Sequence, residues 1–258
     1  MFFSTTRLKF AAGWAFRHLL ISALVVALAA SLVFFVWFPD PWRAMLGVAT
    51  VFGLVVVVDL VCGPLLTLVL ASPDKSKRER WIDLIFVGLI QLVALGYGLH
   101  SVYSARPVVL AFEVDRLHIV TANEVQVDQL KDAPSGLRDL PWRGVLHVAL
   151  RPAISTQEFL DSLNMSLGGV SQSMRPNWWV PYDDQTRAAI LAKAKPLSAL
   201  IGVRPQDAAV LEHAAKRSGQ PVSQLFYLPL TSSKEQSWVA LIGATADMVG
   251  YAPVDGFD

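Results

Sequence analysis

The sequence is short of cysteine and of charge, and each shortage excludes a class of protein. Its 258 residues contain one cysteine, Cys62, which rules out an intramolecular disulfide and a multi-cysteine metal site. Charged residues make up 17% of the chain, with 22 Lys and Arg against 21 Asp and Glu. Because a nucleic-acid-binding protein needs a basic excess, we expect no nucleic acid among the partners.

Motifs of catalysis and cofactor binding are also missing. The chain has no Gly-x-Ser-x-Gly nucleophile elbow, no P-loop and no dinucleotide-binding loop. None of its five histidines has the i, i+4 or His-x-Glu spacing of a metal site. His18 and His100 instead fit the ends of membrane helices, where a polar tip meets water. We therefore expect a protein that is not an enzyme, with no catalytic residue, metal or cofactor.

What the chain has in excess is apolar residues, which make up 53% of it and give a mean hydropathy of +0.45. Three apolar runs, at about 19–38, 44–71 and 82–103, are long enough to cross ~30 Å of hydrocarbon as helices. The sequence thus predicts a membrane domain over 1–104 and a soluble domain of ordinary size over 105–258. Aromatic residues near the ends of the runs fit an interfacial belt: Trp37, Trp42, Trp81, Tyr97 and Tyr103.

Lys and Arg in the short loops predict the orientation of these helices. Three precede the first run, one separates the first and second, and four separate the second and third. Because Lys and Arg favour the cytoplasmic side, the N-terminus is expected in the cytoplasm and the C-terminal domain outside, which at the inner membrane of a Gram-negative bacterium means the periplasm. A cleaved signal peptide is the alternative for the first run, which is too long for a signal h-region.

The second half interleaves strand and helix patterns without regular βαβ spacing, which favours an α+β fold. Apolar and β-branched segments bounded by turn residues predict strands, and capping residues predict helices. Strands are expected at 108–114, 117–121, 145–150, 225–230, 238–243 and 248–251, and helices at 157–167, 185–194 and 206–217.

Asp59 is the most informative residue of the membrane domain. A carboxylate in the middle of a membrane helix costs ~2.5–3.5 kcal/mol, so it should face protein or water. It lies one turn before Gly63-Pro64, where Pro64 should kink the helix. Gln91 is expected at a similar depth in the third helix. Three roles are open: a hydrogen bond from Asp59 to Gln91, a contact with a partner's membrane helix, or transport, which normally needs further intramembrane acids.

An aromatic cluster marks the soluble domain. Residues 178–182 read Trp-Trp-Val-Pro-Tyr, and Trp178, Trp179 and Tyr182 carry large side chains. Such a cluster either packs into the core or forms a patch that faces a partner. The sequence leaves both alternatives open.

Short phrases spread along the whole chain carry a family resemblance. They are VDLVCGPLLTL at 58–68, QLVALGYGLH at 91–100, ARPV at 105–108, FEVDR at 112–116, LPW at 140–142, WVPY at 179–182, LPL at 228–230 and VGYAPVDGF at 249–257. In this order they resemble the TfpX/TfpZ family of type IV pilin accessory proteins. Leu117 departs from the pattern, since an aromatic residue is expected there.

The resemblance implies a membrane protein that binds its cognate major pilin as a chaperone or modulator of pilus assembly, without catalysis. Such pilins place one apolar helix in the bilayer, starting near a free amine, and a globular head outside. Both parts, together with the lipid bilayer, are the expected partners. Alternatives are an accessory subunit of pilin glycosylation and a membrane-anchored periplasmic sensor domain.

Overall fold

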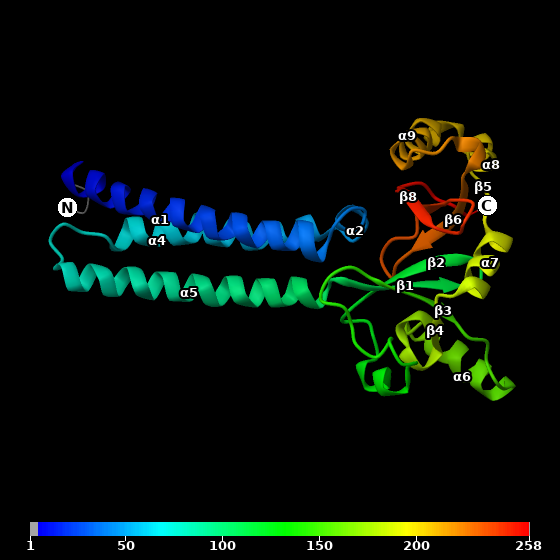
Figure 1. Cartoon of the computed structure of the whole chain (residues 1–258). Helices are drawn as coiled ribbons and strands as arrows, with labels where there is room; N and C mark the ends of the chain where they lie inside the picture. Colours follow the sequence, from blue (N-terminus) through cyan, green and yellow to red (C-terminus); the bar gives the residue numbers. More distant parts are fainter. Residues whose placement is uncertain (1–4, 258) are drawn as a thin grey trace. The chain divides into compact units, whose positions relative to one another are not determined.

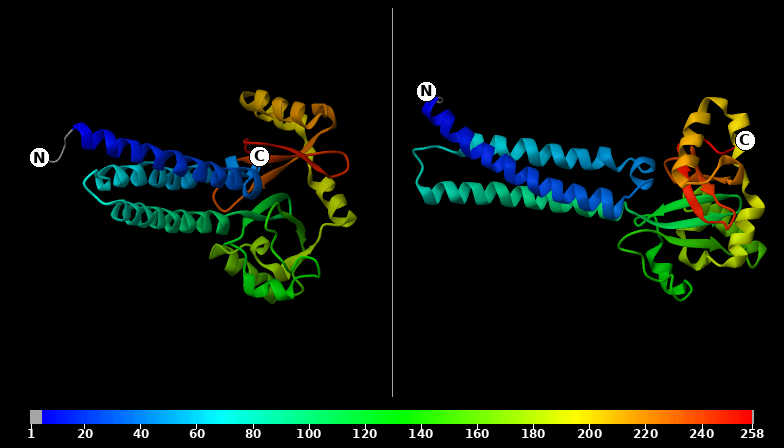
Figure 2. Two further views of the ribbon diagram at one scale, coloured as in Figure 1. Left: turned by 60° about the vertical axis from the view of Figure 1, so that its left-hand side comes forward. Right: turned by 45° about the horizontal axis from the view of Figure 1, so that its top comes forward.

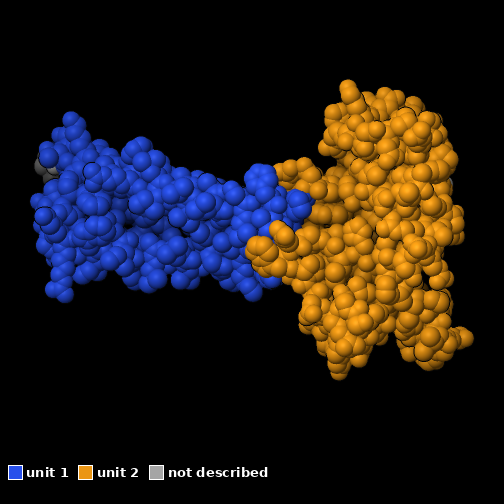
Figure 3. All heavy atoms as spheres, in the orientation of Figure 1, with its two compact units in different colours: residues 1–39, 47–104 blue, residues 40–46, 105–258 orange. Residues whose placement is uncertain are grey.

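The computed structural model describes residues 5–257 and divides them into two compact units (Figure 3). One unit contains the residues up to Pro39 together with Gly47–Ser104, and the other contains Asp40–Leu46 together with the chain from Ala105 onward. The sequence-based division had placed residues 40–46 in the membrane domain. In the structure this short segment belongs with the C-terminal domain.

Long apolar helices form the first unit (Figure 1). Helices α1, α4 and α5 run side by side in all views (Figure 2). The spans Thr5–Trp37, Val48–Leu70 and Lys77–Ser104 are each long and apolar enough to cross a membrane. The elements are α1 (Thr5–Ser31), a π-helix (Leu32–Trp37), α3 (Val48–Val57), a π turn (Val58–Cys62), α4 (Gly63–Leu70) and α5 (Lys77–Ser104).

Helix is the structure expected of these runs, because a helix satisfies its own backbone hydrogen bonds where no water is present. Small residues let the helices approach one another. A Cβ at Gly98 of α5 would lie 2.6 Å from a methyl group of Val55 in α3, so Gly98 allows these two helices to pack closely.

A mixed sheet of eight strands organises the second unit, in the order β4-β3-β1-β2-β6-β7-β8, with β5 beside β6 (Figure 1). The central hairpin β1–β2 is antiparallel, with β3 parallel to β1 and β6 parallel to β2. The strands are β1 (Pro107–Glu113), β2 (Arg116–Thr121), β3 (Leu146–Leu150), β4 (Trp179–Pro181), β5 (Lys195–Pro196), β6 (Phe226–Thr231), β7 (Trp238–Ile242) and β8 (Met248–Ala252).

Helices α2 (Trp42–Met45), α6 (Thr156–Leu167), α7 (Asp184–Lys193), α8 (Leu197–Val203) and α9 (Ala208–Ser218) accompany the sheet. Three membrane-length helices followed by an α+β domain confirm the predicted fold class. All six predicted strands and all three predicted helices are present, with ends at most two residues from those expected. The sequence missed β4, β5, α2 and α8.

The core of the C-terminal domain lies on both faces of the sheet. Alternating residues of β1 divide between two apolar clusters, with Leu110 in one and Val109 in the other. The first cluster also contains Trp42 and Met45 of α2, each 5% exposed. The ring of Trp42 lies 5.4 Å from that of Tyr251 in β8, measured between centroids. Residues 40–46 therefore complete the core of this domain.

Candidate functional site

The polar site of the membrane helices begins with an irregular turn of backbone. Asp59 lies in the π turn Val58–Cys62, directly before Gly63 and Pro64 at the start of α4. In a π turn the carbonyl of residue i accepts from the N–H of residue i+5. The residue five positions after Asp59 is Pro64, which has no N–H. The main-chain carbonyl of Asp59 therefore needs a donor from elsewhere.

Gln91 of α5 supplies this donor. Its Nε2 donates a hydrogen bond of 2.9 Å to the carbonyl oxygen of Asp59. Gly63 makes the contact possible, because a Cβ at that position would overlap the Gln91 amide group. The structure thus brings Asp59, Gly63, Pro64 and Gln91 together. The predicted bond between the two side chains is replaced, however, by one from Gln91 to the Asp59 main chain.

His18 extends this network to a third helix. Its Nε2 lies 2.6 Å from Gln91 Oε1, and its Nδ1 lies 2.5 Å from Thr67 Oγ1 in α4. Since Gln91 Oε1 only accepts, His18 Nε2 carries a hydrogen and donates this bond. The expectation that His18 meets water at a helix end was wrong. Helix α1 begins at Thr5, several turns before His18, so His18 lies well inside the helix. Its ring contacts Thr67 and Gln91 of the neighbouring helices.

The carboxylate of Asp59 stays outside this network. The residue is 3% exposed, and Oδ1 has no hydrogen-bond partner among the described residues. It lines a cavity of about 230 Å³, together with His18, Ser22, Gln91 and apolar side chains of α1 and α5. Burial of a carboxylate without a partner is unfavourable in an apolar medium. The site therefore holds an unsatisfied acceptor beside this cavity.

The aromatic cluster of the C-terminal domain occupies a different environment. Trp178 is 2% exposed and Trp179 is 1% exposed, with Trp179 Nε1 donating to the Ser173 carbonyl at 2.8 Å. Tyr182 is half-buried, and its hydroxyl donates to the Ala246 carbonyl at 3.1 Å. Both tryptophans are therefore enclosed by the domain. The structure favours core packing over a partner-facing patch.

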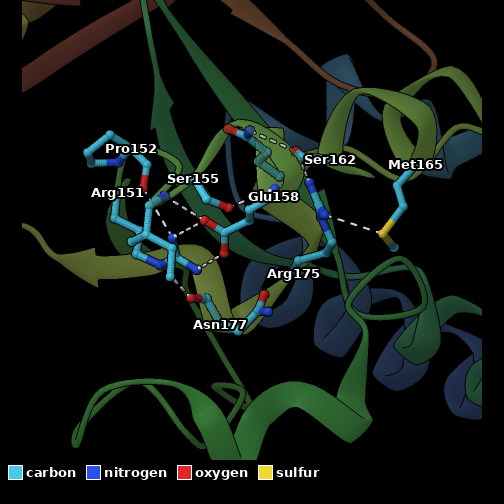
Figure 4. Close-up of polar contacts among 10 residues, drawn as sticks. Arg151, Pro152, Ser155, Glu158, Ser162, Met165, Arg175 and Asn177 are labelled. Carbon is cyan, nitrogen blue, oxygen red and sulfur yellow. Dashed lines mark hydrogen bonds and ion pairs between the residues drawn. The ribbon is translucent and has the colours of Figure 1, made fainter. Parts of the chain in front are cut away.

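Helix α6 carries a surface that the sequence did not reveal, and Figure 4 shows the polar contacts beneath this helix. Its inner side is polar: Arg151 binds both carboxylate oxygens of Glu158, at 2.7 and 3.0 Å, and Arg175 Nη2 donates to Ser162 Oγ at 2.5 Å. The Arg151 guanidinium and the Ile154 N–H lower the pKa of Glu158 to about 2. The apolar side chains of α6 are left exposed instead: Phe159, Leu160, Leu163 and Leu167.

Sequence reasoning also missed His18, Ser22 and Thr67 in the membrane site. A signal was available, since Asp59, Gly63 and Thr67 recur at i, i+4 and i+8 and so share one face of a helix. His18 and Ser22 have the same spacing in the first helix. A stripe of polar and small residues on an otherwise apolar helix indicates a buried helix–helix contact.

Comparisons with known proteins add the biological context. The family described as "Fimbrial assembly protein FimB" matches residues 6–47. Two proteins of Dichelobacter nodosus are similar over 98% of this chain and 98% of their own length: "Fimbrial assembly protein, serogroup I" at 30% identity and "Fimbrial assembly protein, serogroup E1" at 31%. A third protein of the same organism, "Fimbrial assembly protein, serogroups C1 and C2", is 41% identical over 127 residues. The aligned part covers 49% of this chain and 97% of that protein's length.

No solved structure matches this chain. The comparisons support the resemblance at the level of pilus assembly, without the narrower TfpX/TfpZ assignment. Two relatives align with this chain over 98% of its length at 30% and 31% identity, which shows that the chain belongs to the family of fimbrial assembly proteins.

Proposed function

We propose that this protein binds its cognate type IV major pilin in the bacterial inner membrane, as a chaperone or modulator of pilus assembly rather than as an enzyme. The N-terminus lies in the cytoplasm in this proposal, and the C-terminal domain lies in the periplasm. Family membership supports the assembly role. The observation that carries the binding role is the unsatisfied Asp59 carboxylate in a cavity between apolar helices.

In this proposal the pilin's membrane helix packs against the cavity between α1 and α5 and presents a hydrogen-bond donor, its terminal amine, to Asp59. The lining side chains Ile21 and Leu92 are 64% and 60% exposed, so they are available to an apolar partner. Hydrogen bonds between side chains in membranes average only ~0.6 kcal/mol. Packing therefore supplies most of the affinity, and Asp59 sets the register and the choice of partner.

Site-specific photocrosslinking in native membranes tests this function. A photoreactive amino acid at Leu92, which lines the cavity, should crosslink to pilin. The same group at Ile90 is the matched control, since Ile90 is exposed on the same helix but points about 160° away from Leu92. Equal pilin crosslinking from both positions, or none from Leu92, would contradict a pilin site at this cavity.

A further inference from the structure

A second polar site lies in the C-terminal domain and shares no residue with the proposed pilin site. A pocket of about 570 Å³ is formed where the β1–β2 turn, the end of α6 and the residues after β6 meet. Its volume is in the range of small-molecule sites, ~300–1,000 Å³. All of its lining side chains except Val114 are polar or charged. The pocket therefore suits a ligand that makes many hydrogen bonds.

His118 lines this pocket and has an unused acceptor atom next to it. The residue is 9% exposed, and its Nδ1 lies 2.9 Å from Thr231 Oγ1. Because the Thr231 hydroxyl donates to the Leu117 carbonyl at 3.4 Å, its oxygen accepts from His118, and Nδ1 carries the hydrogen. Burial lowers the pKa of His118, which keeps the ring neutral. Nε2 is then a bare acceptor, and it has no hydrogen-bond partner within residues 5–257.

Glu113 provides a second acceptor. Its carboxylate lines the pocket and makes no hydrogen bond or ion pair with any residue that the structure describes. Burial raises the pKa of Glu113, against the opposing influence of Arg116 and Arg175. A donor from a ligand would compensate this desolvation. The Glu113 carboxylate and His118 Nε2 thus both lack a hydrogen-bond donor among the described residues.

Hydrogen-bond donors line the same pocket as Glu113 and His118. Arg116 uses Nε to bind Asp115 at 3.0 Å, and its guanidinium lies 4.8 Å from the centroid of the Phe257 ring. Its terminal nitrogens make no hydrogen bond to the described chain, so their N–H groups are available. Gln236 adds a side-chain amide to the same wall. A ligand here must therefore both donate and accept.

We infer that this pocket binds an uncharged polyhydroxylated ligand, in chemical class a sugar ring. Each hydroxyl donates one hydrogen bond and accepts others, so adjacent hydroxyls match Glu113, His118 and Arg116 at once. Two carboxylates in the wall disfavour an anion, and the polar lining disfavours an apolar ligand. A metal ion is disfavoured because no group of three or more His, Cys, Asp or Glu suited to one occurs among the described residues.

Saturation-transfer NMR on the detergent-solubilised full chain tests this site. The probes are methyl glucoside, methyl galactoside and N-acetylglucosamine at millimolar concentration. At least one should show saturation transfer with the wild type, and its binding should weaken about tenfold in Glu113→Gln, which removes a charge-assisted hydrogen bond but keeps the side chain's shape. Glu212→Gln, on α9 outside the pocket lining, is the matched control and should bind as the wild type does.

Three outcomes would overturn the inference. The first is no saturation transfer from any neutral sugar, and the second is equal binding by Glu113→Gln and wild type. The third is binding of protonated glucosamine without binding of N-acetylglucosamine, which would make the pocket a cation site. His118→Phe gives a second variant, expected to lose binding as well, and thermal unfolding of each variant shows whether the domain is intact.

Discussion

Replacing Asp59 by asparagine separates the internal role of this residue from its role towards a partner. The internal network uses only the main-chain carbonyl of Asp59, which accepts from Gln91 at 2.9 Å. Asp59→Asn leaves this carbonyl, the Gln91–His18 bond and the His18–Thr67 bond unchanged. It also removes a carboxylate that costs ~2.5–3.5 kcal/mol in a membrane helix. The amount of protein in the membrane should therefore stay the same or rise.

Capture of pilin should fall instead, by an amount that follows from the strength of one membrane hydrogen bond. Measured values average ~0.6 kcal/mol and reach about 1.7 kcal/mol. At 298 K these correspond to about 3-fold and about 18-fold in the binding constant. We expect the loss to lie in this range, since packing along α1 and α5 is not changed by the substitution.

The assay is co-purification of pilin with the detergent-solubilised protein, normalised to the amount of each variant. Asp83→Asn is the matched control, because Asp83 is an acid of the span Lys77–Ser104 and pairs internally with Lys75 at 2.6 Å. That variant should capture pilin as the wild type does. If Asp59→Asn also captures as much pilin as the wild type, the carboxylate has no part in recognition and the reasoning from its missing partner is wrong.

Three further predictions concern the rest of the chain. A reporter fused after the last residue should be active as alkaline phosphatase and dark as GFP, and the reverse result would refute the topology inferred from Lys and Arg. Trp42→Ala should lower the free energy of unfolding of the C-terminal domain by about 3–5 kcal/mol in urea, whereas Trp142→Ala, at a residue that is 53% exposed, should change it little. Glu158 has a folded-state pKa of about 2 against 4.5 unfolded, so its contribution is complete above pH 4.5 and is lost as the pH falls towards 2. The protection of the α6 amides, measured as their exchange rate relative to the intrinsic rate at each pH, should fall over that range in the wild type, and a similar fall in Glu158→Gln would refute the assignment.

Local sequence properties were sufficient for the main architecture. Hydropathy and run length identify the three spans, and Ser155 before α6 and Asp183 before α7 are the helix caps that their residue types predict. Strands β4 and β5 were not predicted, because segments of three and two residues are too short to show the apolar–polar alternation of a strand. Strand β5 consists of Lys195 and Pro196, and it exists only through its pairing with β6.

The sequence predicts that Asp59 and Gln91 lie close together in the membrane site, but it does not predict which of their atoms form hydrogen bonds. Counting residues from the loop places Asp59 and Gln91 at one depth, which is enough to predict that they meet. Which atom of Asp59 is bonded depends on the π turn, since an α-helical turn at this point would satisfy the carbonyl from Gly63. The bond also requires that Gln91 of α5 occupies the space that Gly63 leaves. No local pattern contains this information.

Trp42 shows why the domain boundary predicted from composition differs from the boundary in the structure. A tryptophan beside a membrane span has the same sequence signature whether it lies at the lipid interface or in a protein core. Here it is 5% exposed and packs with Tyr251, more than 200 residues further along the chain. Residues 40–46 are held at both ends by membrane helices, yet their side chains belong to the core of the C-terminal domain. A fragment that starts at residue 105 therefore lacks two core side chains, Trp42 and Met45, so it should unfold at a lower temperature than the domain in the full chain.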